Sequence, residues 1–360
     1  MLAYTLKRIL TMVPTLLAAS ILIFIIIELP EGDYISNQIA YLRSTGEQSS
    51  IEKLLYLRSE FALDRPFWQR YLIWLGAMPG PSGFNGLLQG YWGWSFEHQR
   101  PVIEVLGSTL PLTILLNFSS MIFIYAVAFP IGIYSAARQY SWGDHGFTLL
   151  GYIGLATPNF LLALLMMYFA NRWFGLSIGG LMAPQFIGAP LSLEKVGSIL
   201  SHLIIPTIVI GTSGTAAMIR RLRANMLGEL RRHYVITARA KGMGETALLI
   251  KYPLRVAVNP FIADIGNLIP SMVSGSVIVS VVLNLPTVGP VLLSALKSQD
   301  QFLSAFILMF ISSLTLIGML ISDLLLGLLD PRIRKVGFKF KRSNNQLSSH
   351  REDNNGVSPK

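Results

Sequence analysis

Six stretches of apolar residues divide this chain, and they limit what it can fold into more than any other feature. The hydrocarbon core of a bilayer is about 30 Å thick, so a helix needs roughly 20 apolar residues to cross it. Six stretches meet or approach that length, at residues 9–29, 110–137, 147–170, 199–218, 262–285 and 305–329. The pattern predicts an all-α, polytopic membrane protein with about six transmembrane helices.

The composition agrees with a chain that is surrounded mostly by lipid. Hydrophobic residues make up 52% of the 360 residues and charged residues 13%, whereas soluble domains carry about 25% charged residues. Cysteine is absent, which excludes disulfides, thiolate metal sites and a cysteine nucleophile. The net charge of +10 is placed between and after apolar stretches, on one side of the proposed membrane. Membrane topology therefore explains the charge better than nucleic-acid binding does, and no nucleic-acid partner is expected.

The distribution of Lys and Arg predicts that both termini lie in the cytoplasm. With the N-terminus inside, 20 of the 29 basic residues fall in cytoplasmic segments, in agreement with the positive-inside rule. The apolar run 9–29 follows Lys7 and Arg8, but it is far longer than the roughly 7–15 residues of a signal-peptide core, and no small-residue cleavage site follows it. We therefore expect a retained first helix and an even number of spans.

These spans divide the chain into four regions. Residues 1–29 form the N-terminal segment and first helix, 30–108 a long external region, 109–337 a core of five helices, and 338–360 a polar cytoplasmic tail that is predicted to be disordered. The external region has a helical pattern near residues 51–63 and an aromatic-rich stretch after it. Those aromatic residues either pack at the membrane interface, where Trp and Tyr accumulate, or form a surface that receives a soluble partner.

The cytoplasmic region 220–260, between the fourth and fifth apolar stretches, is the most informative part of the sequence. The region is about forty residues long, rich in Lys and Arg, and patterned like a helix. Connections between bundle helices are usually only about 2–8 residues long. Gly242 permits a sharp turn with positive φ, so we predict a helix, a glycine break and a second short helix. Small side chains precede the glycine, and Arg239 and Lys241 supply donors beside it. Such a projection either fits a groove on a cytoplasmic partner or binds anionic lipid headgroups.

An ordered set of motifs along residues 1–337 carries a family resemblance. The most specific is Thr237-Ala238-Arg239-Ala240-Lys241-Gly242. Others, from the N-terminus onwards, are Lys7-Arg8-Ile9-Leu10, Leu63-Asp64-Arg65-Pro66, Gly93-Trp94-Ser95, Thr157-Pro158-Asn159-Phe160, Pro286-Thr287-Val288-Gly289 and Asp330-Pro331-Arg332. Together they resemble the permease subunits of the dipeptide/oligopeptide family of binding-protein-dependent ABC importers. The motif at residues 237–242 resembles the family's cytoplasmic EAA loop.

Two features depart from the family pattern. Ile236 stands where the EAA glutamate of the family falls, and Pro30-Glu31-Gly32-Asp33 contains an acid inserted into the usual Pro-Gly-Asp. The stretch 34–60 is also longer than in typical dipeptide permeases. These departures bear on the identity of the substrate more than on the mechanism.

The resemblance implies a transport subunit with defined partners. The EAA loop of the family forms a coupling helix that docks into a cleft on an ATPase subunit, and closure of two ATPases switches the pathway between outward and inward access. The implied partners are a second homologous permease subunit, two ABC ATPase subunits and an extracytoplasmic solute-binding protein, in the inner membrane of a prokaryote. The implied contact residues are Thr237, Ala238, Arg239, Ala240, Lys241, Gly242 and Glu245.

The sequence lacks the motifs of an enzyme. No G-x-x-x-x-G-K-[ST] P-loop occurs, so the chain cannot hold ATP phosphates in that way, and neither H-E-x-x-H nor G-x-S-x-G is present. We expect no catalytic residue, metal site or cofactor in this chain, with ATP and Mg²⁺ bound by the partner ATPase subunits.

Polar residues in or near the spans are candidates for lining a translocation pathway. The four candidates are Asn159, Ser271, Ser274 and Asp323. Asp323 either joins two helices through a hydrogen bond or salt bridge, or lines the pathway. The small residues of the fifth stretch suit close helix packing or a pore wall. Prolines at positions such as 158 and 206 are expected to kink their helices.

Three classes of function remain open at this point. The first is the importer permease, with di- or oligopeptides as cargo and oligosaccharides as the alternative. The second is a stand-alone ion-coupled secondary transporter that depends on an intramembrane carboxylate such as Asp323, although no paired repeats are visible. The third is a membrane-anchored receptor or enzyme that works through the external region, where His98 stands without a nucleophile or metal constellation.

Overall fold

The computed structural model describes residues 2–45, 48–175, 179–190 and 192–329, so the predicted tail and the Asp330-Pro331-Arg332 motif lie outside the described residues. Within these ranges the chain is almost entirely helical, and its two strands, of two residues each, pair with one another. The prediction of an all-α protein is therefore confirmed.

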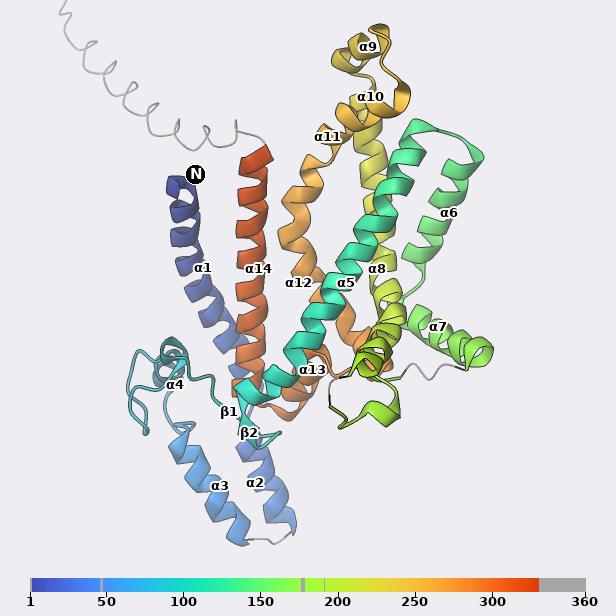
Figure 1. The fold of residues 1–360 in the computed structure, drawn as a ribbon. Helices are drawn as coiled ribbons and strands as arrows, with labels where there is room; N and C mark the ends of the chain where they lie inside the picture. The colour runs from blue at the N-terminus through green and yellow to red at the C-terminus, as the bar shows by residue number, and fades with distance from the viewer. Residues whose placement is uncertain (1, 46–47, 176–178, 191, 330–360) are drawn as a thin grey trace, which may run out of the picture.

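Long apolar helices form the body of the protein (Figure 1). Four of the described helices are long and apolar enough to cross a membrane: α1 (Leu2–Glu28), α5 (Val102–Ala137), α8 (Leu193–Leu230) and α14 (Gln301–Leu329). A bent pair of helices raises the number to five if it counts as one span. In place of the fifth predicted stretch lies α12 (Asn259–Val282), whose 24 residues extend about 36 Å at 1.5 Å per residue. The polytopic membrane class is confirmed, and the count of six spans stays a prediction.

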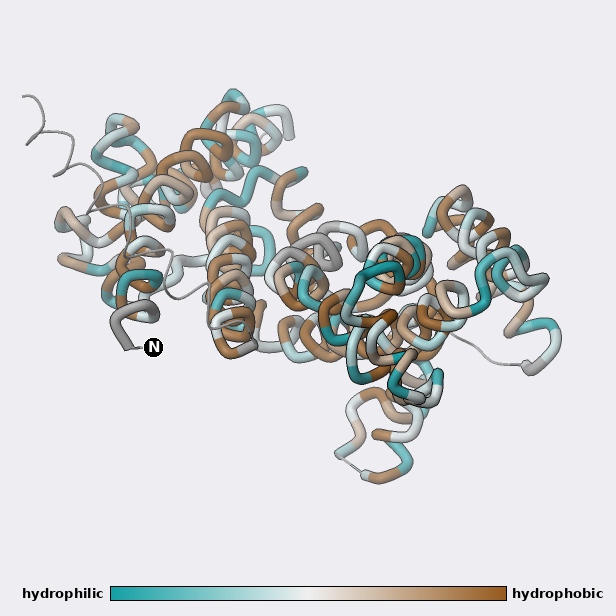
Figure 2. The backbone as a smooth tube through the Cα atoms, turned by 90° about the horizontal axis from the view of Figure 1, so that it is seen from above, coloured by the Kyte–Doolittle hydropathy of each residue, from teal (hydrophilic) through white to brown (hydrophobic). Residues whose placement is uncertain are grey.

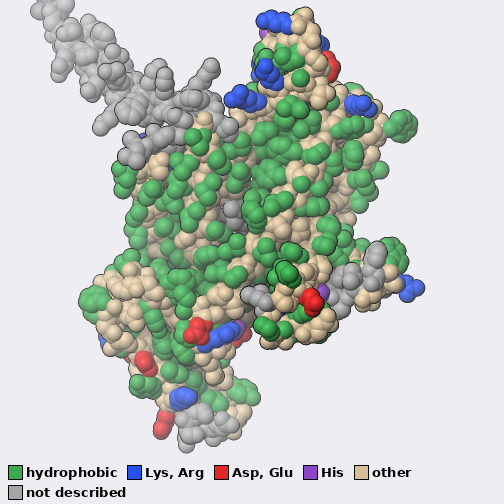
Figure 3. Space-filling model, viewed as in Figure 1, with side chains coloured by type: hydrophobic (Ala, Val, Ile, Leu, Met, Phe, Trp, Pro, Cys, Tyr) green, Lys and Arg blue, Asp and Glu red, His purple; other side chains and the backbone are tan. Residues whose placement is uncertain are grey.

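The surface of the bundle is hydrophobic between its two ends. Seen from above, most of the helical tube is hydrophobic, and hydrophilic residues gather in connecting segments (Figure 2). On the face shown in Figure 3, Lys and Arg gather at the end that carries α9 (His233–Ala240) and α10 (Glu245–Lys251). The first turn of α1 and the last turn of α14 lie toward that same end (Figure 1). This arrangement agrees with the predicted topology, although which side is cytoplasmic stays a prediction.

The third predicted span is not one continuous helix: it breaks beside Pro158, where a kink was predicted, and whether the two pieces cross the membrane as one broken span stays a prediction. The region 147–170 contains the end of α6 (Trp142–Ala156) and most of α7 (Asn159–Phe174), which meet at an angle of 104°. Thr157 is extended, with φ −83° and ψ 120°, because the ring of Pro158 disfavours helical backbone at the preceding residue. Neither piece, at roughly 22–24 Å, is long enough to cross the hydrocarbon core alone.

The fourth span is longer than predicted. After α7 the chain passes through the 3-10 turn η2 (Pro184–Phe186) and enters α8, which continues for 38 residues to Leu230. Residues 220–230, predicted as the start of a loop, are therefore helical. The largest core cluster lies where α5 packs against α8, with Leu116, Ile124, Val209 and Leu222 among its fully buried members.

Close approach of backbones joins α12 to α14. A Cβ atom on Gly266 of α12 would lie 2.6 Å from the carbonyl carbon of Gly318 on α14, which only glycine avoids. The N–H of Gly266 donates to Ser322 Oγ at 2.7 Å. On the other side of α14, Arg8 of α1 forms an ion pair with Asp323 (3.1 Å). The helices α1, α14 and α12 therefore form a connected group.

The external region folds at the end opposite α9 (Figure 1). Its elements are α2 (Tyr34–Thr45), α3 (Gln48–Glu60), α4 (Phe67–Leu75), the turn η1 (Leu87–Gln89), and the antiparallel strands β1 (Trp94–Ser95) and β2 (Arg100–Pro101). The helical pattern near residues 51–63 is confirmed as α3. Asp300, between α13 (Val288–Ser298) and α14, is fully buried and accepts hydrogen bonds from Ser95 Oγ (2.7 Å) and the Glu97 N–H (3.1 Å).

Candidate functional site

Residues 233–251 form a bent projection that we name the α9–α10 segment (Figure 1). The helix α9 ends in a Schellman motif, in which the N–H of Gly242 donates to the Arg239 carbonyl (3.0 Å) and that of Met243 to the Ala238 carbonyl (3.4 Å). Gly242 has a φ of +80°, which other L-residues adopt only with strain. The helix α10 then begins at Glu245. The predicted order of helix, glycine break and helix is confirmed.

A small hydrophobic core holds the α9–α10 segment in its bent shape. Val235, Ala238 and Leu248 are buried there. Val235 and Ala238 are three residues apart, so they lie on one face of α9 and meet α10 across the bend. The half-buried residues around them come from both ends of the segment and beyond: Leu230, Met243 and Tyr252. The bend is therefore a folded unit that is connected to α8 on one side and to α11 (Pro253–Ala257) on the other.

The outer surface of the α9–α10 segment carries most of the predicted contact residues. Six of the seven are exposed: Thr237, Arg239, Ala240, Lys241, Gly242 and Glu245. Ala238 differs, because it is 6% exposed and faces the small core, so in this conformation it supports the segment and offers no contact surface. Two exposed apolar residues had not been predicted as contacts, Ile236 (52%) and Ile250 (60%). The position of Ile236, at the EAA glutamate, was a signal that could have identified it.

Arg239 and Glu245 form a two-bond ion pair across the glycine turn. The Arg239 Nε donates to Glu245 Oε1 at 2.7 Å, and Nη2 donates to Oε2 at 3.1 Å. These hydrogen bonds from Arg239 lower the pKa of the Glu245 carboxyl, and Glu245 raises the pKa of Arg239. A carboxylate in the first turn of α10 is also favoured by the helix dipole. Within the part of the chain that the structure describes, Lys241 has no ion-pair partner, so its charge stays available at the tip.

The basic end of α8 anchors this projection to α6, a connection that the sequence analysis missed. Arg223 binds Asp144, in the first turn of α6, through Nε–Oδ1 (2.9 Å) and Nη2–Oδ2 (2.7 Å) bonds. Asp144 is 2% exposed, and its carboxylate also accepts from the Tyr140 N–H (2.9 Å). The guanidinium of Arg220 lies 5.5 Å from the ring centroid of Tyr152 on α6. No signal in the sequence links residues so far apart in the chain.

The structure does not bring the predicted pathway residues into one site. Asn159 is the half-buried first residue of α7, a helix that lies toward the end of the bundle that carries α2, α3 and α4, whereas Asp323 is in the last turns of α14, toward the opposite end (Figure 1). Asp323 is paired with Arg8, which is the helix-joining alternative stated for it. Ser271 and Ser274 lie in α12 among residues whose side chains the structure does not describe. Their role in a pathway stays a prediction.

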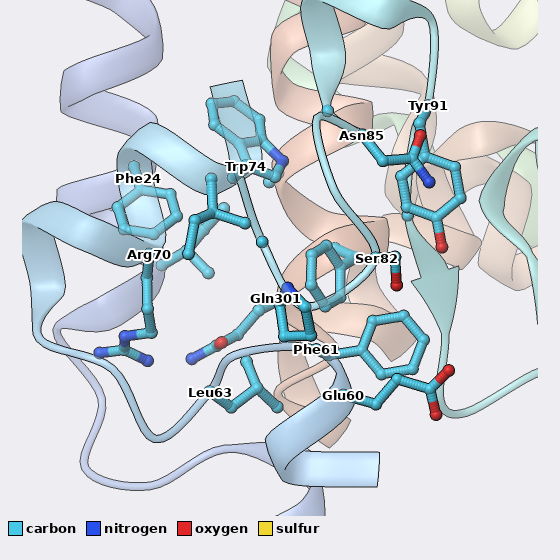
Figure 4. Close-up of a pocket in the computed structure, with 18 of the residues that line it drawn as sticks. Phe24, Glu60, Phe61, Leu63, Arg70, Trp74, Ser82, Asn85, Tyr91 and Gln301 are labelled. Atoms are coloured by element: carbon cyan, nitrogen blue, oxygen red, sulfur yellow. The ribbon is translucent and has the colours of Figure 1, made fainter. Parts of the chain in front are cut away.

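A concave site lies in the external region, where α4 and the loop after it meet α1 and α14. The cavity is about 110 Å³ and has aromatic walls that include Phe24, Phe61 and Trp74 (Figure 4). Arg70 lines it and is ion-paired with Glu28 at the end of α1. Trp74 is buried against Phe24, with ring centroids 5.7 Å apart, so packing accounts for this aromatic residue. Among the described residues, no group of His, Asp and Glu could hold a metal ion.

These features define a multi-pass, all-α membrane protein with a folded extension at one end and an exposed basic projection at the other. The chain belongs to the family described as "Binding-protein-dependent transport system inner membrane component", whose model matches residues 128–335. That family makes it a membrane subunit of a transport system, in agreement with the resemblance drawn from its motifs.

Curated relatives cover nearly the whole chain. It is 34% identical over 339 residues to the oligopeptide transport system permease protein AppB of Bacillus subtilis, which covers 92% of this chain and 99% of the relative. It is 30% identical over 339 residues to the glutathione transport system permease protein GsiC of Salmonella paratyphi A, with 93% and 99% covered. It is 28% identical over 353 residues to the dipeptide transport system permease protein DppB of Escherichia coli, with 93% and 99% covered.

Proposed function

We propose that this chain is the channel-forming permease subunit of an ATP-driven ABC importer in the inner membrane of a prokaryote. The observation that carries the proposal is the α9–α10 segment. This folded, basic segment projects from the ends of two long helices, at the end of the protein opposite the external region. A helical knob with small residues on its surface suits a groove on a cytoplasmic partner. Membership in a binding-protein-dependent transport family supports this choice over a lipid-binding loop.

In the proposed mechanism the energy comes from other chains. This sequence contains no P-loop, so we assign the binding of ATP and Mg²⁺ to two separate ABC ATPase subunits. Their closure moves the α9–α10 segment, and the helices attached to it rock between outward and inward access. A second homologous permease subunit completes the pathway, and an extracytoplasmic binding protein delivers the solute to the external region.

The proposed cargo is a di- or oligopeptide. The names of the relatives support this class, since they describe oligopeptide, dipeptide and glutathione transport. Oligosaccharides are the alternative cargo for the same machinery. The longer stretch at residues 34–60, which contains α2 and α3, is the part of the chain that motivates this alternative.

A stand-alone ion-coupled transporter is the competing function of another class. It needs an intramembrane carboxylate that gains and loses a proton during transport. Asp323, the candidate for that role, forms an ion pair with Arg8 of α1 at 3.1 Å, so it already joins two helices. The contact therefore supports a structural role and speaks against the competing function.

Purification of the intact complex from membranes tests the proposal. We expect a tagged chain, extracted in mild detergent, to bring down a homologous permease and ATPase subunits. Reconstituted into liposomes with its binding protein, the complex should import labelled di- or tripeptides only when ATP is supplied. Absence of any ATPase from the complex would overturn the proposal, as would uptake that persists without ATP but collapses with a protonophore. Import of trisaccharides in place of peptides would leave the machinery intact and change the cargo.

A further inference from the structure

Three arginines near the cytoplasmic end of α8 point to different partners. Arg220 lies over Tyr152 of α6, and Arg223 binds Asp144, also on α6. Arg221 forms an ion pair with Asp264 of α12 instead. The geometry of a helix explains the division, because successive residues are rotated by about 100°. Positions 220 and 223 therefore lie about 60° apart on one face, and position 221 faces away from both.

The Arg221–Asp264 ion pair is the charged connection that the described residues show between α8 and α12. It is reinforced by the ring of Phe261, whose centroid lies 5.9 Å from the Arg221 guanidinium carbon. Phe261 is itself fully buried, and its carbonyl accepts a hydrogen bond from Tyr125 of α5 at 3.3 Å. The side chains of Arg221 and Asp264 are 52% and 33% exposed, so the pair lies at the surface of the bundle near the ends of the two helices.

The position of this ion pair relates it to the α9–α10 segment. The segment is connected to α8 at Leu230 and, through α11, to α12 at Asn259. Arg221 lies about 14 Å before the end of α8, and Asp264 about 8 Å after the start of α12, at 1.5 Å per residue. Nearer the segment, Asn225 Nδ2 donates to the Ala257 carbonyl at 3.4 Å. The two helices that emerge from the segment are therefore joined to each other close to the segment.

We propose that Arg221 and Asp264 are positioning residues for energy coupling. The ion pair holds α12 against α8, so that a displacement of the α9–α10 segment moves both helices together. Without it, α8 can follow the segment while α12 lags behind, and ATP is hydrolysed without movement of the pathway. This inference rests on the proposed importer function and identifies residues beyond the docking surface that this function requires.

The Arg8–Asp323 ion pair provides a matched control. It also joins two long helices, α1 and α14, through an arginine and an aspartate. Neither of those helices is connected directly to the α9–α10 segment. A role in holding the bundle together predicts similar effects from breaking either pair, whereas a role in coupling predicts an effect specific to Arg221 and Asp264.

The test uses the complete transport complex in liposomes with its binding protein. The variants are Arg221→Asp, Asp264→Arg and the exchanged pair with both changes, beside the same three changes at Arg8 and Asp323. For each complex, the measured quantities are subunit recovery, ATP hydrolysis and the number of solute molecules imported per ATP. We expect each single change at Arg221 or Asp264 to lower import per ATP on the order of tenfold, with complexes recovered and ATP still hydrolysed. The exchanged pair should restore import per ATP to within about threefold of the unmodified complex.

Several outcomes would overturn the inference. The first is unchanged import per ATP in the single variants of Arg221 and Asp264. The second is an exchanged pair that assembles but whose import per ATP stays as low as in the single variants. The third is an equal loss of import per ATP in the control variants of Arg8 and Asp323. If a single variant does not assemble, the exchanged pair decides: recovery of assembly without improved import per ATP assigns the pair to folding alone. The unmodified complex separates this inference from the proposed function. If it shows no ATP-dependent import, the proposed function fails; if it does and the variants match it, only the role of Arg221 and Asp264 fails.

Discussion

Replacement of Gly242 by alanine isolates the backbone requirement of the α9–α10 segment. Gly242 has a φ of +80°, and a Cβ atom added there would meet no other atom within 4 Å. The cost of the substitution therefore comes from the left-handed backbone and not from a clash inside the chain. That cost is about 1–2 kcal/mol for an L-residue, which corresponds to a factor of about 5–30 in the equilibrium between the bent segment and its opened forms.

Gly244 offers a matched control two residues away. It too has open space around the position of a Cβ atom, but its φ of −61° is ordinary for any residue. Gly244 is the N-cap of α10, where serine is at least as favourable as glycine, so we expect Gly244→Ser to leave the segment as stable as before or slightly more so. Asparagine tolerates the left-handed region better than alanine, so Gly242→Asn should recover part of the loss.

Two measurements follow this change in the intact complex. Hydrogen exchange of a peptide covering residues 238–248 should lose protection by about 5–30-fold in Gly242→Ala and should not lose protection in Gly244→Ser. Uptake per ATP should fall in Gly242→Ala, because in the proposed function the ATPase subunit binds the bent conformation. Unchanged exchange in Gly242→Ala would refute the backbone argument. Normal exchange with lost uptake would show instead that the partner surface needs the space above the glycine.

Three further predictions concern the rest of the fold. Asp144→Asn removes one partner of the ion pair with Arg223 and should lower the free energy of unfolding by on the order of 3 kcal/mol, measured as a lower Tm in detergent. Arg223→Met should lower it by a similar amount. An unchanged Tm in both variants would contradict a stabilising ion pair at this place. Gly266→Leu should prevent recovery of monodisperse protein, because α14 occupies the space, whereas Gly275→Leu, in open space, should not. Burial raises the pKa of Asp300, so its protonated form is favoured on folding. We therefore compare the free energy of unfolding of the unmodified chain with that of Asp300→Asn. The advantage of the unmodified chain should be greatest below the ordinary carboxyl pKa of 3.8 and should decline as pH rises through the higher pKa of the folded state. A difference in urea unfolding that does not change with pH would contradict this.

Local information was enough to predict the parts of the fold that depend on it. Apolar stretches of about 20 residues reveal membrane helices because the bilayer imposes the same length everywhere. The helix–glycine–helix order around Gly242 was also local, since the left-handed cap needs only the residues of one turn. Which side of α9 faces a partner was less accessible. Ala238 and Ala240 are alike in sequence, yet only Ala238 meets Leu248 in the small core.

Connections between distant residues could not be predicted from one sequence. Arg223 and Asp144 are 79 residues apart, and Arg221 and Asp264 are 43 residues apart. The three neighbouring arginines of α8 appear in the sequence as one basic cluster. Only the rotation of the helix and the placement of α6 and α12 beside it separate their roles. The same cluster that suggested a loop instead lies on a helix, because α8 continues to Leu230.

The prolines at positions 158 and 206 show how packing decides between two outcomes of one local rule. Both disfavour helical backbone at the residue before them, so the sequence predicted a kink at each. Pro206 is buried among Ile205, Val209 and other core residues of α8, and α8 continues through it. Pro158 is exposed in this chain, as are Leu155 and Phe160 beside it, so no packing opposes the extended preference of the preceding residue. The chain therefore bends by 104° where the proline and the side chains beside it are exposed, and the helix stays continuous where the proline is buried against the core that α5 and α8 share. A proline alone indicates a weak point in a span, and its surroundings determine whether the helix breaks there.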